Sequence, residues 1–202
     1  ARNLTADGDA PPGRGMGVVV GDCDLDGWPD FYVANDGTPN FLYHNQGNGT
    51  FRESGAASGT AYGLSGQTEA GMGVDLGDYD NNGYPDLTVT NFQGEPNDLY
   101  RNEGHGFFAN DTYSSGTGWV TTPFLGFGTN FLDFDNDGWL DLFVSGYRPT
   151  PAMSPPTISD CRTRANSPAS TATRVMVLFS TWPVRPRATK SSLRWGAISA
   201  IS

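Results

Sequence analysis

Short apolar runs, separated by turn residues, mark the first three quarters of the chain. One set of runs leads into a loop rich in Asp and Gly, and these runs are GVVV at 17–20, GVDL at 73–76 and TNFL at 129–132. A second set leaves that loop, namely FYVA at 31–34, LTVT at 87–90 and LFVS at 142–145. Such β-branched and aromatic runs predict short strands, and no segment shows the apolar spacing of a helix.

A second motif supplies two further strands in the first two units. It reads NFLYHNQGNGTF from Asn40 and NDLYRNEGHGFF from Asn97. We expect FLY and DLY to form a third strand, and TF and FF to begin a fourth. NQGNG and NEGHG are typical of hairpin turns, because Gly and Asn tolerate a positive φ. Four short antiparallel strands per unit indicate one blade of a β-propeller.

The units recur at an almost fixed period. The first Asp of the acidic loop falls at Asp22, Asp78 and Asp133, which gives spacings of 56 and 55 residues. A Gly stands five residues before each of them, at Gly17, Gly73 and Gly128. A fixed period of this size indicates a repeat architecture. The sequence therefore predicts an all-β fold over residues 1–147, a partial β-propeller of about three four-stranded blades.

Each acidic loop presents oxygen-bearing side chains at alternate positions. If its first Asp is position 1, oxygen side chains stand at positions 1, 3, 5 and 9, and position 6 is always Gly. Alternate oxygens over a tight turn converge on one point, the Gly permits the bend, and the carbonyl of position 7 can add a ligand. A flexible cage of hard oxygen ligands favours calcium, whereas magnesium demands a stricter octahedron. Zinc is disfavoured because the pattern contains no set of His or Cys ligands.

We therefore expect about three calcium sites. The predicted ligands are Asp22, Asp24, Asp26, Trp28 and Asp30 in the first loop, Asp78, Asp80, Asn82, Tyr84 and Asp86 in the second, and Asp133, Asp135, Asp137, Trp139 and Asp141 in the third. Trp28, Tyr84 and Trp139 enter this set through their carbonyls, and we expect their rings to pack beside the loop.

Two other interpretations of the loop were weighed. An EF-hand needs a bidentate Glu at position 12 and flanking helices, but position 12 here is Val33, Val89 or Val144, within a strand. A solvated turn would also use Asp, Asn and Gly, yet three loops in register disfavour that interpretation. The expected role of calcium is structural, because it would neutralise each loop and hold its two strands together.

The loop and its surroundings resemble a known family of repeats. D-x-D-x-D/N-G-x-x-D followed by an apolar strand resembles the calcium loop of FG-GAP/VCBS repeats, the blades of integrin-α-like propellers. GFGTNFLDFDNDGWLDLFVSG, from Gly126, above all resembles the repeats of the ASPIC/UnbV and cartilage acidic protein 1 family. The resemblance covers about residues 13–147. It implies a secreted or cell-surface calcium-bound propeller, although the ASPIC/UnbV segment itself is not visible in this chain.

Charge divides the chain after Tyr147. Residues 1–147 carry 21 acidic and 4 basic residues, whereas residues 148–202 carry 1 acidic and 8 basic residues. The acidic first part would repel nucleic acid. No apolar run in the sequence is long enough for membrane insertion. The 2 cysteines, Cys23 and Cys161, do not form a disulfide framework.

The basic segment 148–202 departs from the repeats in composition as well. It contains 1 of the 27 Gly and is rich in Ser, Thr, Pro and Arg. The genetic code permits a DNA sequence for Arg174–Trp182 that, translated from the third base of its first codon, encodes GDGTFLDV. This shifted segment matches GNGTF at Gly47. With the same shift, Arg194–Ile201 becomes MGSDFGDF, which is close to MGVDLGDY at Met72. We hypothesise a frameshift after Tyr147 and expect an unstructured, out-of-frame tail.

We expect the chain to be a fragment, because it begins at Ala1 and not at Met. We expect it to be non-enzymatic, because its sequence shows no catalytic triad order and no phosphate loop. The expected function is a calcium-binding extracellular scaffold for adhesion or protein interaction, whose partner is an extracellular protein or a glycan. The expected location is secreted, periplasmic or at the cell surface. The alternative is a propeller domain of a larger carbohydrate-binding or carbohydrate-active enzyme. The two His, His44 and His105, are interpreted as surface residues of the turn motif.

Overall fold

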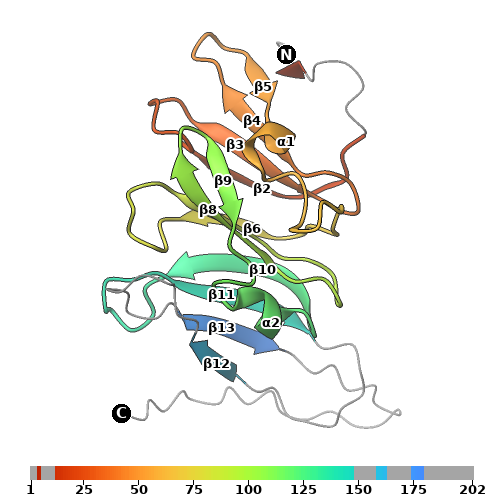
Figure 1. Cartoon of the computed structure of the whole chain (residues 1–202), viewed down its shortest axis with the longest axis vertical. Coiled ribbons are helices and arrows are strands. Elements are labelled where there is room, and N and C mark those ends of the chain that lie inside the picture. Colours follow the sequence, from red (N-terminus) through yellow and green to blue (C-terminus); the bar gives the residue numbers. More distant parts are fainter. Residues whose placement is uncertain (1–3, 6–11, 148–157, 163–173, 180–202) are drawn as a thin grey trace, which may run out of the picture.

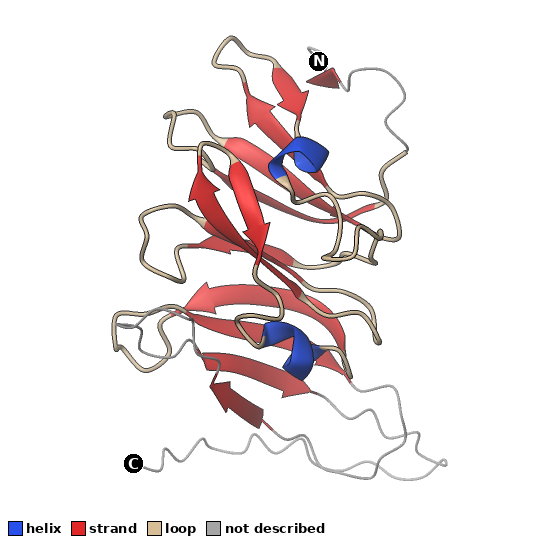
Figure 2. Ribbon diagram, viewed as in Figure 1, coloured by secondary structure: helices blue, strands red, loops and turns tan. Residues whose placement is uncertain are grey.

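The computed structural model describes residues 4–5, 12–147, 158–162 and 174–179. In these parts the chain forms three β-sheets, which are stacked one on another along its long axis (Figures 1 and 2). Each sheet begins with a pair of antiparallel strands joined by an acidic loop. The predicted all-β architecture of propeller-like blades is therefore confirmed.

The first two sheets follow the predicted order of four strands. Blade 1 comprises β2 (Gly15–Gly21), β3 (Asp30–Asn35), β4 (Phe41–Asn45) and β5 (Phe51–Glu53). Blade 2 comprises β6 (Val74–Gly77), β7 (Asp86–Val89), β8 (Asp98–Gly104) and β9 (Phe107–Asn110). Neighbouring strands in both blades are antiparallel. A short strand, β1 (Leu4–Thr5), adds to β5 in parallel.

The third sheet keeps only the first half of this pattern. β10 (Leu125–Leu132) and β11 (Asp141–Tyr147) pair like their counterparts, but β13 (Arg174–Phe179) then joins β11 in parallel, and β12 (Ile158–Arg162) joins β13. These two strands were not predicted. RVMVLF, the sequence of β13, is a β-branched and apolar run that pairs with the edge of β11. The rest of 148–202 lies outside the described residues, so the unstructured tail and the frameshift stay predictions.

The blades approach one another through the first strand of each. A Cβ added to Gly17 would lie 2.2 Å from the carbonyl oxygen of Met72, and one added to Gly73 would lie 2.1 Å from that of Phe127. Both distances are far below van der Waals contact, so only Gly allows the backbone of the next blade to come this close. In two of the three repeats, the Gly five residues before the acidic loop is therefore required for close packing of neighbouring blades.

The main hydrophobic core is shared by blades 1 and 2. Tyr32, Leu42, Leu87 and Tyr100 are buried in one cluster, against which Val74 of β6 also packs. Each buried tyrosine satisfies its hydroxyl by donating to a backbone carbonyl, Tyr32 to Thr60 at 2.8 Å and Tyr100 to Tyr62 at 3.0 Å. Because a buried polar group costs free energy when it is unpaired, these two bonds let large rings fill the space between the blades.

Two short helices occupy equivalent connections between blades. α1 (Gly55–Ser58) follows β5 and α2 (Thr117–Thr121) follows β9. The sequence predicted no helix, because elements of 4 and 5 residues are too short to show an apolar period. Neither of these helices, nor any other helix in the described part of the chain, is long and apolar enough to cross a membrane.

A buried polar cluster lies at the blade edge opposite the acidic loops. The amide nitrogen of Asn91 donates to carboxylate oxygens of Glu69 and Asp98, both at 3.0 Å, and to the Pro96 carbonyl at 2.7 Å. The side-chain nitrogen of Asn91 has two hydrogens for these three acceptors, and a proton shared by the carboxyl groups of Glu69 and Asp98 would reduce the repulsion between them. Burial, with the neighbouring Asp98, raises the pKa of Glu69 from 4.5 to about 9.

The Glu69 site predicts a pH dependence of stability in the metal-free protein. A raised folded-state pKa gives stability that is fully present below about pH 4.5 and is lost as pH rises through about 9. Tyr32 and Tyr100, which face the same cluster, do not titrate in this window, because burial raises the pKa of each well above 10.0. Glu69→Gln stays neutral, so we expect its stability relative to that of the wild type to rise by about 6 kcal/mol between the two ends of this window.

The measurement is urea denaturation in a chelator at the two ends of that pH range. Glu95→Gln is the matched control, since Glu95 accepts the Ala70 N–H at 2.9 Å in the same region. We expect this control to follow the wild type closely, with a slightly smaller pH dependence, because Glu95 is the weakest of the groups that raise the pKa of Glu69. An unchanged difference between Glu69→Gln and the wild type across the range would show that the carboxyl pair does not share a proton.

Candidate metal centres

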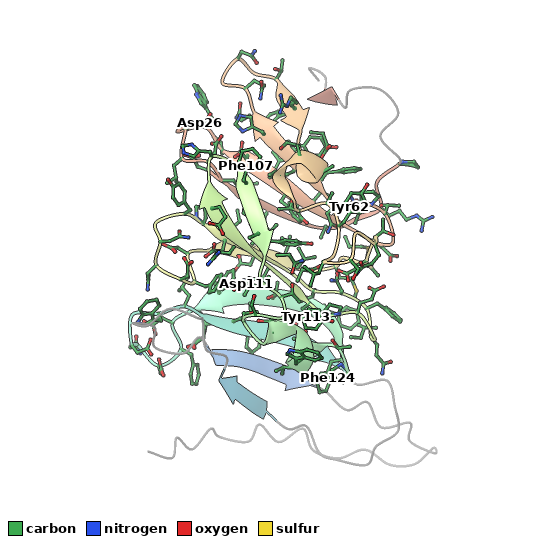
Figure 3. All side chains as sticks on the ribbon, in the orientation of Figure 1. Asp26, Tyr62, Phe107, Asp111, Tyr113 and Phe124 are labelled. Carbon is green, nitrogen blue, oxygen red and sulfur yellow. The ribbon has the colours of Figure 1, made fainter. Side chains whose placement is uncertain are left out.

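The three acidic loops project from one edge of the stacked sheets. They connect β2 to β3, β6 to β7 and β10 to β11, and in Figure 1 they lie one above another on the left. Asp26 of the first loop is at the free tip of its blade in Figure 3. The repeat in the sequence is therefore also a repeat in space, with one loop at the same place in each blade.

The carboxylate at position 1 closes each loop in the same way. One oxygen of Asp22 accepts the N–H of Asp26 at 3.1 Å, and the other accepts the N–H of Gly27 at 2.8 Å. The bonds of the other two loops are equivalent: Asp78 accepts from Asn82 and Gly83 at 3.0 and 2.9 Å, and Asp133 accepts from Asp137 and Gly138, both at 3.0 Å. A side chain that binds two backbone N–H groups fixes the turn before any ion is considered.

Two left-handed residues give the loop its sharp bend. Position 6 is Gly27, Gly83 or Gly138, with φ between 87° and 92°, as the repeat of Gly predicted. Position 4 also has a positive φ, and its residues are Leu25, Asn81 and Asn136, with φ of 60°, 56° and 58°. Asn tolerates this region, whereas Leu does not, so the first loop carries backbone strain that the other two lack.

The carboxylate at position 9 belongs to the core of its blade. Asp30, Asp86 and Asp141 are each at most 4% exposed, at the first residue of β3, β7 and β11. Asp86 accepts the Tyr79 N–H at 2.9 Å and the Asn102 N–H at 2.7 Å. Asp30 accepts the equivalent pair, Cys23 and Asn45, at 3.1 and 2.8 Å. Position 9 therefore joins the loop to the hairpin formed by the third and fourth strands.

Burial of these carboxylates makes them costly to ionise without a cation. Desolvation raises the pKa of Asp86 from 3.8 to about 8, and it also raises the pKa of Asp30. At position 3, burial and then the nearby Asp78 raise the pKa of Asp80. A divalent cation would offset both effects, since it favours the ionised form of every carboxylate that it contacts.

Most of the predicted carboxylate ligands converge. One carboxylate oxygen from each member lies within 4.8 Å of the others in three groups: Asp22, Asp24 and Asp26; Asp78, Asp80 and Asp86; Asp133, Asp135 and Asp141. Among the described side chains, Asp137 is in no such group, and its Oδ1 accepts the Trp139 N–H at 2.9 Å. Asn82 accepts from Tyr84 in the same way at 2.8 Å. Clusters of oxygen donors on a tight loop fit calcium, and the carbonyl ligands at position 7 stay predictions.

The aromatic rings at position 7 pack against the hairpin turn of their own blade. A Cβ added to Gly47 would lie 2.9 Å from Nε1 of Trp28, and one added to Gly104 would lie 3.0 Å from Cζ of Tyr84. Each ring thus covers a turn Gly with positive φ. This confirms for two loops that the rings pack beside the loop.

His44 lies beside the first loop, where the sequence interpretation had placed a surface residue. Its Nδ1 is 3.4 Å from Oδ2 of Asp24 and 3.2 Å from Oδ1 of Asp30. The side chain is 29% exposed, so His44 is at the surface, but its contact with the loop was not predicted, although a signal existed. NFLYHN and NDLYRN place His44 and Arg101 at the same position, directly before the Asn whose N–H binds position 9.

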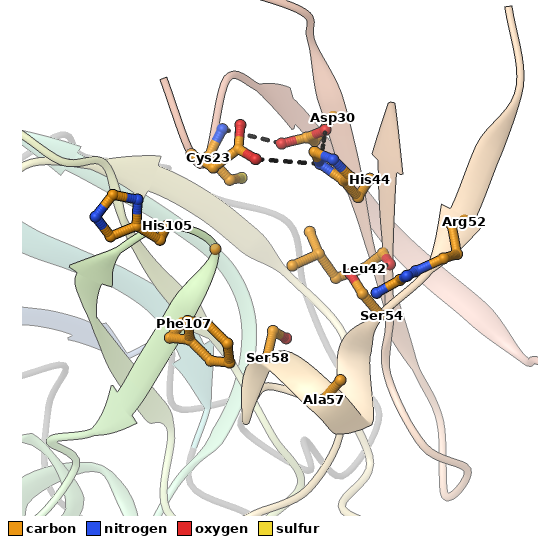
Figure 4. Close-up of a pocket in the computed structure, with 12 residues that line it drawn as sticks. Cys23, Asp30, Leu42, His44, Arg52, Ser54, Ala57, Ser58, His105 and Phe107 are labelled. Carbon is orange, nitrogen blue, oxygen red and sulfur yellow. Dashed lines mark hydrogen bonds and ion pairs between the residues drawn. The ribbon is translucent and has the colours of Figure 1, made fainter. Parts of the chain in front are cut away.

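Cys23 and His105 come together with His44 at a cavity between blades 1 and 2. The cavity has a volume of 180 Å³ and is also lined by Asp24 and Asp30. His105 is on the β8–β9 turn, and Figure 4 shows it across the cavity from His44. Burial, with the surrounding carboxylates, raises the pKa of the Cys23 thiol to about 12, so Cys23 behaves as a small core residue.

The match to a known protein family coincides with the repeats of the structure. A family model described as the FG-GAP-like repeat matches residues 22–89 and 78–144. Each match runs from position 1 of one loop to the strand after the next loop, so both flanking loops lie within it. No curated protein matches the chain.

Proposed function

The chain belongs to the FG-GAP-like repeat family, and we propose that it acts outside the cell as a calcium-binding propeller scaffold for adhesion or protein interaction. In this proposal the protein is non-catalytic and calcium is mainly structural. The partner is an extracellular protein or a glycan, and the location is secreted, periplasmic or at the cell surface.

One observation carries the proposal: the same loop is built three times. In all three copies position 1 accepts two backbone N–H groups, position 6 is a left-handed Gly, and three carboxylates converge within 4.8 Å. Convergent carboxylates repel one another when no cation lies among them. A divalent cation bound among the carboxylates would offset this repulsion in each loop, which explains why the arrangement is repeated.

The structural role of calcium follows from the position of the ligands. Asp22 stands just after β2, whereas Asp30 is the first residue of β3, so an ion held by the loop would clamp these two strands together. The same holds for the other two blades. The ligands would be Asp22, Asp24, Asp26 and Asp30 in the first loop, with their counterparts in the second and third loops.

The finer family assignment is also a proposal. GFGTNFLDFDNDGWLDLFVSG, which covers most of β10, the third loop and most of β11, supports placing the chain in the ASPIC/UnbV and cartilage acidic protein 1 branch. Its coding DNA tests this assignment. A restored reading frame after Tyr147 should continue the D-x-D-x-D-G blades and reach an ASPIC/UnbV segment.

The function is tested by measuring metal binding and partner binding in the same preparation. Terbium replaces calcium at oxygen sites, and its luminescence reports proximity to Trp28 and Trp139 at position 7. We expect calcium-competed terbium signal from the full chain, and a strong loss when Asp24, Asp80 and Asp135 are all changed to Asn. An array of secreted proteins and glycans, probed with calcium and with chelator, then identifies the ligand class. Wild-type binding that does not respond to calcium, or no competed signal, would overturn the proposal.

A further inference from the structure

His44 makes the first loop chemically different from the other two. It stands on β4, and its Nδ1 faces one oxygen of Asp24 and one of Asp30, at 3.4 and 3.2 Å. The second loop has Arg101 at the equivalent position, and a guanidinium cannot ligate a metal. An imidazole and two carboxylates therefore meet only in blade 1 among the described loops.

We propose that Asp24, Asp30 and His44 form a site for a first-row transition metal such as zinc or cobalt, which shares Asp24 and Asp30 with the calcium site of the same loop and differs from it by the imidazole of His44. Calcium prefers hard oxygen ligands, whereas imidazole suits zinc, cobalt and nickel. The proposal extends the proposed function, but it does not require that the loop binds calcium.

The two distances from the imidazole nitrogen of His44 to the carboxylate oxygens fit such an ion. Zinc holds nitrogen and oxygen ligands at about 2.0–2.2 Å, so two ligand atoms at a tetrahedral angle lie about 3.4 Å apart. The two distances from Nδ1 of His44, 3.4 and 3.2 Å, are close to this value. The third spacing, between one oxygen of Asp24 and one of Asp30, is within 4.8 Å.

The surroundings hold these ligands in place and leave room for a fourth. Asp30 is 1% exposed and is oriented by the N–H groups of Cys23 and Asn45, at 3.1 and 2.8 Å. Hydrogen bonds of this kind to a ligating carboxylate fix its direction. The 180 Å³ cavity begins at the three ligands, so a water molecule can complete a four-coordinate site from that side (Figure 4).

Blade 2 allows a test in which a transition-metal site is created, to complement the test in which the site of blade 1 is removed. Arg101 lies directly before Asn102, as His44 lies before Asn45, and Asp80 and Asp86 correspond to Asp24 and Asp30. Arg101→His should therefore assemble the same three ligands in the second blade. His105→Gln is the control for loss, because His105 lines the cavity but does not contact either carboxylate in the proposed set.

The experiment is titration of the full chain with cobalt, followed by its visible absorption, with calcium binding measured on the same samples. We expect the wild type and His105→Gln to bind one cobalt at this site, His44→Gln to bind about tenfold or more weakly, and Arg101→His to bind a second equivalent. Asp22→Asn, which changes position 1, should weaken calcium binding and leave cobalt binding unchanged.

Each outcome decides between the two proposals. Equal cobalt binding by His44→Gln and the wild type would overturn the transition-metal site, whatever calcium does. Calcium binding without cobalt binding would overturn this site and leave the proposed function standing. Cobalt binding that depends on His44, without any calcium binding, would support this site and overturn the calcium scaffold.

Discussion

Saturating calcium is expected to raise the free energy of unfolding of the full chain by about 8 kcal/mol over its value in chelator. A ligand held at about one hundred times its Kd stabilises the folded state by about 2.7 kcal/mol per site, and three sites triple this gain. The physical reason lies in the loops, where three carboxylates converge within 4.8 Å and two of the buried position-9 carboxylates have raised pKa values.

The measurement is urea denaturation at neutral pH in calcium, in magnesium at matched ionic strength, and in chelator. Matched ionic strength is needed because residues 1–147 carry a large excess of acidic residues, and their mutual repulsion is screened by any salt. Asp135→Ala should remove about one third of the calcium effect, since it disables a single loop. Equal stability in calcium and in chelator would contradict the assignment of all three loops.

The sequence predicted the strands and loops of the first two blades because their signals are local. Apolar runs such as 31–34 and 87–90 fall within β3 and β7 or extend one residue past the strand, and the turn NQGNG lies between β4 and β5. The left-handed Gly at position 6 was predicted for the same reason, because a tight turn of alternating oxygens needs it.

Features that depend on contacts between repeats could not be predicted in this way. The role of Gly17 becomes visible only when the Met72 carbonyl lies 2.2 Å from the point where a Cβ would be. His44 was assigned to the surface because its sequence neighbours belong to a turn motif, whereas its partners are Asp30, on the neighbouring strand β3, and Asp24, in the loop before that strand. The short helices and the parallel pairing of β13 with β11 likewise have no periodic signal.

A second large effect is expected at position 9, where Asp86→Ala should destabilise the protein by about 3–4 kcal/mol even in chelator. Two buried backbone donors, the N–H groups of Tyr79 and Asn102, lose the carboxylate oxygens that accept their hydrogen bonds, and each such loss costs about 1–3 kcal/mol. Asp86→Asn keeps one acceptor oxygen, so it should cost about half as much.

Asp80→Ala is the control that separates stability from metal binding. Its Oδ1 accepts the Asn82 N–H at 3.1 Å at the exposed part of the loop, so its loss in chelator should cost less than about 1 kcal/mol. In calcium both variants should lose the contribution of the second loop. Denaturation in chelator is the decisive comparison. If Asp86→Ala and Asp80→Ala were equally stable there, position 9 would act only as a metal ligand, and the core of blade 2 would not depend on the carboxylate that joins its loop to its hairpin.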